Sequence, residues 1–256
     1  MKLVLLGTGS SDGVPVLGCK CSVCISKKAF NTRCRQSLYI ESKTTKLVID
    51  PGQDFKYQMA SNNLVHLDGI LVTHSHFDHI GGMNDIRAVC AAMGKPVPVL
   101  ADEYTLTDIH RVFEYLFKGI VYVGDKRIPA ISQSVLVPYR ERSIGDINFI
   151  PFTQEHGSVN SLGFKFNNFV YSTDVKNFPD DSVDIIRGAD LWFVDCLGYG
   201  NYSGHLNLDN TLRWIKEIKP KKAILIHMSH AIDYYDLSAR LPQNVVLGHD
   251  KMIMHV

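Results

Sequence analysis

Short apolar runs separated by polar turns dominate the chain, and most of them are too short to be helices. Runs of four to six residues rich in Val, Ile, Leu and Phe are typical of β-strands. They predict strands at Leu3–Leu6, Ser37–Glu41, Lys46–Ile49, Gly69–Thr73, Val97–Leu100, Ile147–Phe152, Gly163–Phe166, Phe169–Ser172, Leu191–Val194, Ala223–Ile226, Val245–Leu247 and Lys251–Val256. Some runs alternate and others are apolar throughout, so we expect strands buried on one face and strands buried on both.

Three segments instead repeat their apolar residues at helical spacing. The first follows Gly82, with Asn84 or Asp85 as its cap, and ends near Met93. The second begins at Asp102 and places on one face Ile109, Val112, Phe113, Leu116 and Phe117. The third begins at Asp209, carries Leu212, Ile215 and Ile218, and stops before Pro220. Strands outnumber helices, so we predict an α/β (α+β) protein with two packed sheets and helices outside.

Composition and charge narrow the possible classes. The chain has 256 residues, of which 45% are hydrophobic and 21% charged, which excludes a disordered, collagen-like or coiled-coil protein. With no linker, repeat or low-complexity tract, we predict a single domain over residues 1–256. A net charge of +1 lacks the basic excess of a general nucleic-acid binder. No apolar stretch suits a membrane span or signal peptide, so we expect a cytoplasmic protein with reduced cysteines.

The densest cluster of metal-binding residue types follows one apolar run. Residues 70–82 read ILVTHSHFDHIGG, so His74, His76, Asp78 and His79 come directly after a predicted strand. Four such groups within six residues can splay around two adjacent ions on a tight loop. Imidazole and carboxylate ligands suit Zn²⁺, Mn²⁺ or Fe²⁺.

Three further candidates also follow apolar strands. His156 follows the strand predicted to end at Phe152, Asp174 follows FVYS, and His227 follows AILI. Each residue alone has an ordinary alternative role as a hydrogen-bonded His or a turn-capping Asp. Together with HSHFDH they form a ligand set for two ions.

These residues occur in the order found in the metallo-β-lactamase superfamily, and residues 1–230 resemble it. The resemblance implies an αββα sandwich with a dinuclear metal centre at one edge. It assigns His74, His76 and His156 to one ion, and Asp78, His79 and His227 to the other, with Asp174 bridging them. Asp50, in VIDPG, resembles the family's Asp that supports the ligand shell without binding metal. An Asp ligand and no Cys ligand are the pattern of its phosphodiesterase-type hydrolases.

A second metal site is predicted in a loop at about residues 18–36. Cys19, Cys21 and Cys24 supply three thiolates, one short of the four ligands that a structural zinc prefers. His230, three residues beyond His227, is our candidate for the fourth ligand. This combination resembles the PhnP group within the superfamily, in which three cysteines and such a His bind a structural zinc. A zinc there would also hold the loop that carries His227.

The expected chemistry is the hydrolysis of a phosphodiester. Two ions would share a bridging water and lower its pKa toward neutrality, so that hydroxide can attack phosphorus. His205, in SGHLNLDN, is our candidate for the general acid that protonates the leaving alkoxide, and relatives carry an extra His in a comparable segment. We count Asp78 with His205 among the catalytic residues. Five cations in the cysteine segment either form a solvated face or attract an anionic substrate: Lys20, Lys27, Lys28, Arg33 and Arg35.

Three functions fit these residues. The resemblance favours a PhnP-like phosphodiesterase that opens a small cyclic phosphodiester such as 5-phosphoribosyl 1,2-cyclic phosphate. For such an enzyme we expect no membrane partner, and a homodimer is possible. A tRNA 3′-processing endonuclease like ribonuclease Z is the second. Its expected basic arm is weak here, because the insertion at 94–145 is only mildly basic. A non-hydrolytic protein like the PQQ-biosynthesis B protein is the third, although an intact ligand set argues against it.

Overall fold

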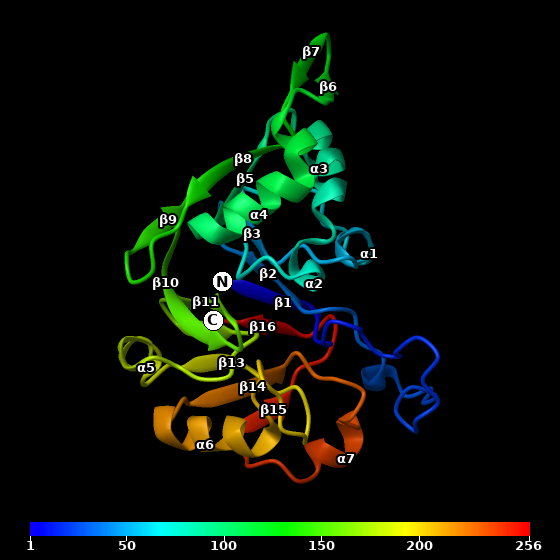
Figure 1. The fold of residues 1–256 in the computed structure, drawn as a ribbon, viewed down its shortest axis with the longest axis vertical. Coiled ribbons are helices and arrows are strands. Elements are labelled where there is room, and N and C mark those ends of the chain that lie inside the picture. Colours follow the sequence, from blue (N-terminus) through cyan, green and yellow to red (C-terminus); the bar gives the residue numbers. More distant parts are fainter.

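Two sheets of seven strands pack face to face in the computed structural model, which describes residues 1–256, and helices cover their outer surfaces (Figure 1). This is the αββα sandwich expected from the sequence. The two ends of the chain lie side by side near the middle of the molecule (Figure 1), where β1 pairs with the last strand, β16. None of the helices combines the length and hydropathy that crossing a membrane requires.

The first sheet contains, in spatial order, β16 (Ile253–His255), β1 (Lys2–Gly7), β2 (Ser37–Glu41), β3 (Lys46–Ile49), β4 (Gly69–Leu71), β5 (Val97–Ala101) and β8 (Ile131–Val135). The second contains β15 (Val245–Leu247), β14 (Lys222–Ile226), β13 (Leu191–Asp195), β12 (Phe169–Ser172), β11 (Val159–Phe166), β10 (Ile147–His156) and β9 (Arg142–Ile144). A separate hairpin of β6 (Val121–Val123) and β7 (Lys126–Ile128) projects from one end of the molecule (Figure 1).

The helices form the two outer layers. They are α1 (Phe55–Ser61), α2 (Phe77–Ile80), α3 (Ile86–Met93), α4 (Glu103–Phe113), α5 (Asp180–Ile186), α6 (Leu208–Ile218) and α7 (Tyr234–Ser238), with short 3₁₀ helices η1 (Ala29–Asn31), η2 (Met83–Asp85) and η3 (Glu114–Phe117). Helices α1 to α4 lie over the first sheet, and α5 to α7 lie over the second (Figure 1).

Continuous apolar strands are explained by burial on both faces. In β1, Leu3 and Leu5 join the core between the sheets, whereas Val4 and Leu6 join the core under the first set of helices. Each such aliphatic side chain stabilises the fold by about 1.5–3 kcal/mol when fully buried. A charged side chain in the middle of such a strand would be buried on either face, so the functional side chains gather at the strand ends.

The helix predicted from Asp102 is present, with one difference in its buried face. Asp102 caps α4, because its side chain accepts a hydrogen bond from the Thr105 amide at 2.8 Å. Ile109 and Phe113 are buried, as predicted, but Val112 lies at the edge of that face and is 48% exposed. The strand predicted to stop at Phe152 also continues, so that His156 is the last residue of β10.

Parallel strands bring the ends of both sheets to one edge of the sandwich. Strands β3, β4 and β5 run parallel in the first sheet, and β12 to β15 run parallel in the second. In open α/β sheets, ligands bind beyond the carboxyl ends of such strands. Here this edge carries the predicted metal ligands.

Candidate metal centre

Three of the strand ends at this edge turn sharply into left-handed backbone conformations. Asp50, after β3, has a φ of 60°; Asp174, after β12, has a φ of 51°; and His227, after β14, has a φ of 57°. Such a conformation costs a residue other than glycine about 1–3 kcal/mol, and it is retained where the surrounding structure requires it. All three side chains are buried at the same edge.

One group of potential ligands contains His74, His76, His156 and Asp174. His74 Nε2 lies 3.8 Å and His156 Nε2 lies 3.6 Å from Asp174 Oδ1. His76 Nδ1 lies 3.2 Å from His156 Nε2. The loop after β4 supplies two of these side chains and the second sheet supplies the other two, so the group joins the sheets.

A second group contains Asp78, His79, Asp174 and His227. His79 Nε2 lies 3.2 Å from Asp78 Oδ2 and 3.3 Å from Asp174 Oδ2, and His227 Nε2 lies 3.2 Å from the same Asp174 oxygen. The two oxygens of Asp174 therefore face different groups, as a bridging carboxylate requires.

The unpaired atoms of these groups fit metal ions. His74 Nε2, His79 Nε2 and His227 Nε2 are buried and have no hydrogen-bond partner. Buried polar atoms without a partner are rare, because each one destabilises the folded protein by about 1–3 kcal/mol. Zinc–nitrogen bonds of about 2.0–2.1 Å in a tetrahedron place neighbouring ligand atoms about 3.4 Å apart. The observed separations therefore suit divalent cations.

Charge at the centre also suits cations. Burial lowers the pKa of His74 and of His156, which keeps both imidazoles in the neutral form that binds metal. Burial alone would lower the pKa of His79, but the carboxylates of Asp174, Asp78 and Asp50 raise it well above its ordinary value. The field that favours a proton on His79 equally favours a metal ion at that place.

Outer contacts fix how the histidines point. Asp50 accepts hydrogen bonds from the Thr73 amide at 2.8 Å and from His79 Nδ1 at 2.8 Å. His156 Nδ1 donates to the carbonyl of Gly204 at 2.6 Å. Each contact leaves Nε2 of the histidine free to bind metal, which is the usual second layer of a metal site. Asp50 thus lies where a carboxylate can support the ligand shell through His79.

His205 lies against the centre and contacts a carboxylate that the sequence analysis missed. Its Nδ1 donates to Asp195 Oδ2 at 3.0 Å, and its Nε2 lies 4.0 Å from Asp174 Oδ1. Burial would lower the pKa of His205, but Asp195 raises it to about 9. Asp195 is fully buried at the end of β13, in LWFVD. The strand-end pattern that identified Asp174 and His227 would also have found Asp195.

The structure brings together the four side chains of the cysteine cluster, Cys19, Cys21, Cys24 and His230. Cys19 Sγ and Cys21 Sγ lie 3.3 Å and 3.4 Å from His230 Nδ1, and Cys24 completes the group. The Cys24 amide donates to Cys21 Sγ and, together with His230, lowers the pKa of Cys21 to about 6. A thiolate is the form that binds zinc. Three sulfur atoms and one nitrogen fit a closed tetrahedral site.

Arg33 connects the cysteine segment to the loop that carries His227 and His230. Arg33 is 2% exposed, and its guanidinium donates to the carbonyls of Ser229 and Ile232, at 3.0 Å and 2.8 Å. Arg35 pairs with Asp54 at 3.2 Å. These two arginines of the segment are therefore used within the fold and do not form a free patch for an anionic substrate.

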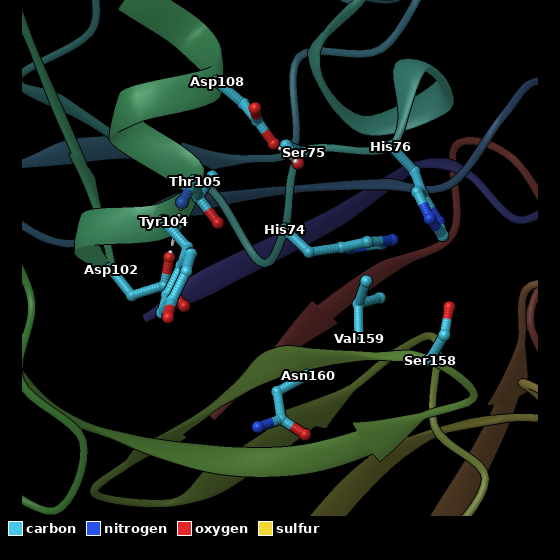
Figure 2. Close-up of a pocket in the computed structure, with 10 residues that line it drawn as sticks. All are labelled: His74, Ser75, His76, Asp102, Tyr104, Thr105, Asp108, Ser158, Val159 and Asn160. Carbon is cyan, nitrogen blue, oxygen red and sulfur yellow. Dashed lines mark hydrogen bonds between the residues drawn. The ribbon is translucent and has the colours of Figure 1, made fainter.

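Two cavities meet at the centre and share His76 and Ser158. One cavity has a volume of about 330 Å³ and is lined by Asp78, His205 and His227, among others. The other, of about 390 Å³, extends from His74 toward the first turn of α4 (Figure 2). Neither cavity is lined by a Lys or Arg. A bound molecule can therefore reach the centre from two sides.

Comparison with known proteins agrees with this architecture. The family model for the beta-lactamase superfamily domain matches residues 45–228. The crystal structure of a diphosphatase from the PhnP family superposes with a TM-score of 0.91 at 30% identity, covering 99% of this chain and 96% of that one.

Two curated relatives bear other names. An octanoyltransferase of Porphyromonas gingivalis is 30% identical over 253 residues, which are 98% of this chain but 50% of that protein. The exodeoxyribonuclease YycJ of Bacillus anthracis is 27% identical over 180 residues, 64% of this chain and 62% of that protein. This chain thus spans about half the length of the first relative.

Proposed function

We propose that this chain, which belongs to the beta-lactamase superfamily and has the metallo-β-lactamase fold, is a metal-dependent phosphodiesterase that hydrolyses a small, cyclic phosphodiester. The proposal includes two divalent ions, Mn²⁺, Zn²⁺ or Fe²⁺, at the buried centre. It also includes one structural Zn²⁺ held by Cys19, Cys21, Cys24 and His230.

The observation that carries this proposal is the shared carboxylate of Asp174. One oxygen faces the group of His74, His76 and His156, and the other faces the group of Asp78, His79 and His227. The donors are only imidazoles and carboxylates, without a thiol. Such a set holds two hard or borderline cations side by side, which suits a substrate whose reacting centre carries negative oxygens.

The residues around the centre have separate tasks. Two bound divalent ions would supply Lewis-acid stabilisation of the phosphoryl oxygens and an activated water. Asp50 and the Gly204 carbonyl hold His79 and His156 in orientation. Asp195 holds His205 with its Nε2 facing the cavity beside Asp174, where it can donate a proton to a leaving oxygen.

A diphosphate ester is the second candidate substrate, because the similar PhnP-family structure is that of a diphosphatase. Its reacting centre has the same anionic oxygens and would use the same donors. The nuclease relative raises the alternative of a long nucleic acid. A net charge of +1 and cavities without Lys or Arg weigh against that partner and against a ribonuclease Z-like function. The complete donor set weighs against a non-hydrolytic protein like the PQQ-biosynthesis B protein.

A substrate panel tests the proposed function. The purified protein, with its metal content measured, is assayed on bis(p-nitrophenyl) phosphate, a nucleoside 2′,3′-cyclic phosphate, 5-phosphoribosyl 1,2-cyclic phosphate, a diphosphate diester, single-stranded DNA and a tRNA precursor. We expect turnover of small phosphodiesters that disappears in an Asp78→Ala variant. Cleavage of only DNA or tRNA, or of only the diphosphate, would contradict the proposal.

A further inference from the structure

The larger of the two cavities is built from elements on opposite sides of His74. The first turns of α4 contribute Asp102, Tyr104, Thr105 and Asp108, and the turn between β10 and β11 contributes Ser158, Val159 and Asn160. In Figure 2, His74 and His76 border the cavity from the metal centre, and Tyr104 and Asn160 lie beyond His74 on facing elements. A volume of about 390 Å³ is within the range of small-molecule sites.

The charge of this cavity disfavours a second phosphate on the substrate. Its charged residues besides the histidines are Asp102 and Asp108, and it has no Lys or Arg. Asp108 accepts a hydrogen bond from Ser75 at 2.7 Å, and Asp102 is the cap of α4. The amino end of a helix on its own favours an anion, but here the Asp102 carboxylate already occupies that position. An additional phosphate would therefore lie beside two carboxylates without a cation to balance it.

The shape and polarity of the cavity favour a flat ring. Tyr104 is 87% exposed, so most of its ring has no partner in the protein. An exposed aromatic ring binds a nucleobase by stacking, which is worth about a 5- to 150-fold change in affinity. Asn160 and Ser158 offer hydrogen-bonding groups around it. A single ring is not the aromatic cage that recognises a quaternary ammonium group.

We propose that this cavity binds the base of a nucleoside, so that the substrate is a nucleoside phosphodiester without a further phosphate group. Tyr104 stacks on the base, and Asp102 selects against a second anion. The inference rests on the proposed phosphodiesterase function and names the substrate class of that same site.

Three cyclic phosphates separate the contribution of the base from that of a second phosphate. Adenosine 2′,3′-cyclic phosphate carries a base, 5-phosphoribosyl 1,2-cyclic phosphate carries a second phosphate, and ribose 1,2-cyclic phosphate carries neither. We expect kcat/KM to be highest for the adenosine substrate and lowest for the substrate with the second phosphate. Equal kcat/KM values for the three substrates, or a preference for the substrate with the second phosphate, would overturn the inference. If bis(p-nitrophenyl) phosphate is still hydrolysed, the proposed function survives that result.

Variants of Tyr104 test the stacking directly. Tyr104→Ala should raise KM for the adenosine substrate about 5- to 150-fold, with little change for ribose 1,2-cyclic phosphate. Tyr104→Phe keeps the ring and should keep the wild-type KM. Tyr122→Ala is the control, because Tyr122 is 67% exposed but lies on the β6–β7 hairpin outside the cavity. A Tyr104→Ala variant with an unchanged KM would contradict the assignment.

A variant of Asp102 tests the charge. Asp102→Asn keeps an oxygen that can accept from the Thr105 amide, so the cap of α4 is retained. We expect it to raise kcat/KM for 5-phosphoribosyl 1,2-cyclic phosphate up to about 5-fold and to leave the adenosine substrate nearly unchanged. An equal change for both substrates would show that Asp102 does not select against the second anion.

Discussion

The buried centre and the cysteine cluster hold metal-binding side chains in opposite ways. The centre takes ligands from the ends of strands in both sheets, and Asp50 and the Gly204 carbonyl fix the orientation of two of them, His79 and His156. The cysteine cluster takes three ligands from one loop and one from another, and all four are only half-buried. The fold therefore positions the ligands of the centre, whereas a zinc ion would position the loop of the cysteine cluster.

The two sites are joined through a short stretch of chain. His227 belongs to the centre and His230 to the cysteine cluster, three residues apart. Arg33, from the cysteine segment, donates hydrogen bonds to two carbonyls of the same stretch. We infer that the centre performs the chemistry and that the cysteine cluster holds one of its ligands in place. Variants of the centre should therefore lose mainly activity, whereas variants of the cysteine cluster should lose mainly stability.

The largest expected effect is the loss of the shared carboxylate. Asp174→Ala removes a donor from both groups of the centre, so we expect activity to fall to background and metal analysis to find up to two fewer ions per chain. The ion of the cysteine cluster should remain. Asp190→Ala, which changes an exposed aspartate paired with Lys221, is the control. Retained activity in Asp174→Ala would refute a bridging role.

The next largest effect separates proton donation from metal binding. His205→Ala should lower turnover of an alkyl phosphodiester about 100-fold, because its leaving alkoxide needs a proton. Turnover of bis(p-nitrophenyl) phosphate should change little, since p-nitrophenolate leaves without one. Metal content should match that of wild type and of a His66→Ala control, which changes an exposed histidine. An equal loss on both substrates would remove His205 from the role of general acid.

A smaller effect on activity, with a large one on stability, is expected at the cysteine cluster. Cys21→Ser should remove one ion per chain and lower the Tm by roughly 10 °C, because structural zinc contributes several kcal/mol to folding. Activity should fall about 10-fold as His227 loses its support. Cys34→Ser is the matched control, since Cys34 lies outside the cluster. A Cys21→Ser protein with full metal content would contradict the zinc assignment.

The sequence predicts the layers of the fold well because apolar side chains determine them. Leu3 and Val4 belong to different cores, and only strands buried on both faces read as uninterrupted apolar runs. The predicted end of β10 was wrong because its last residues alternate between buried and exposed within a polar hairpin. Strands such as β8, in which several residues are exposed, contain no apolar run that would identify them in the sequence.

The site was predictable where chemistry coincides with a strand end. His74, Asp174 and His227 follow apolar strands, and the parallel topology brings those ends together. Arg33 could not be assigned from sequence, since a charged residue gives no sign that it is buried between two loops. Tyr104 was also missed, because an exposed aromatic residue at the start of a helix becomes informative only once a cavity is seen beside it.

Anomalous X-ray diffraction from crystals of the purified protein, measured at the absorption edges of the metals found in it, tests the dinuclear centre directly. We expect three peaks for each chain. Two should lie about 3.5–4 Å apart on either side of Asp174, and the third should lie among Cys19, Cys21, Cys24 and His230. A single peak at the centre, or none beside Asp174, would contradict a dinuclear site.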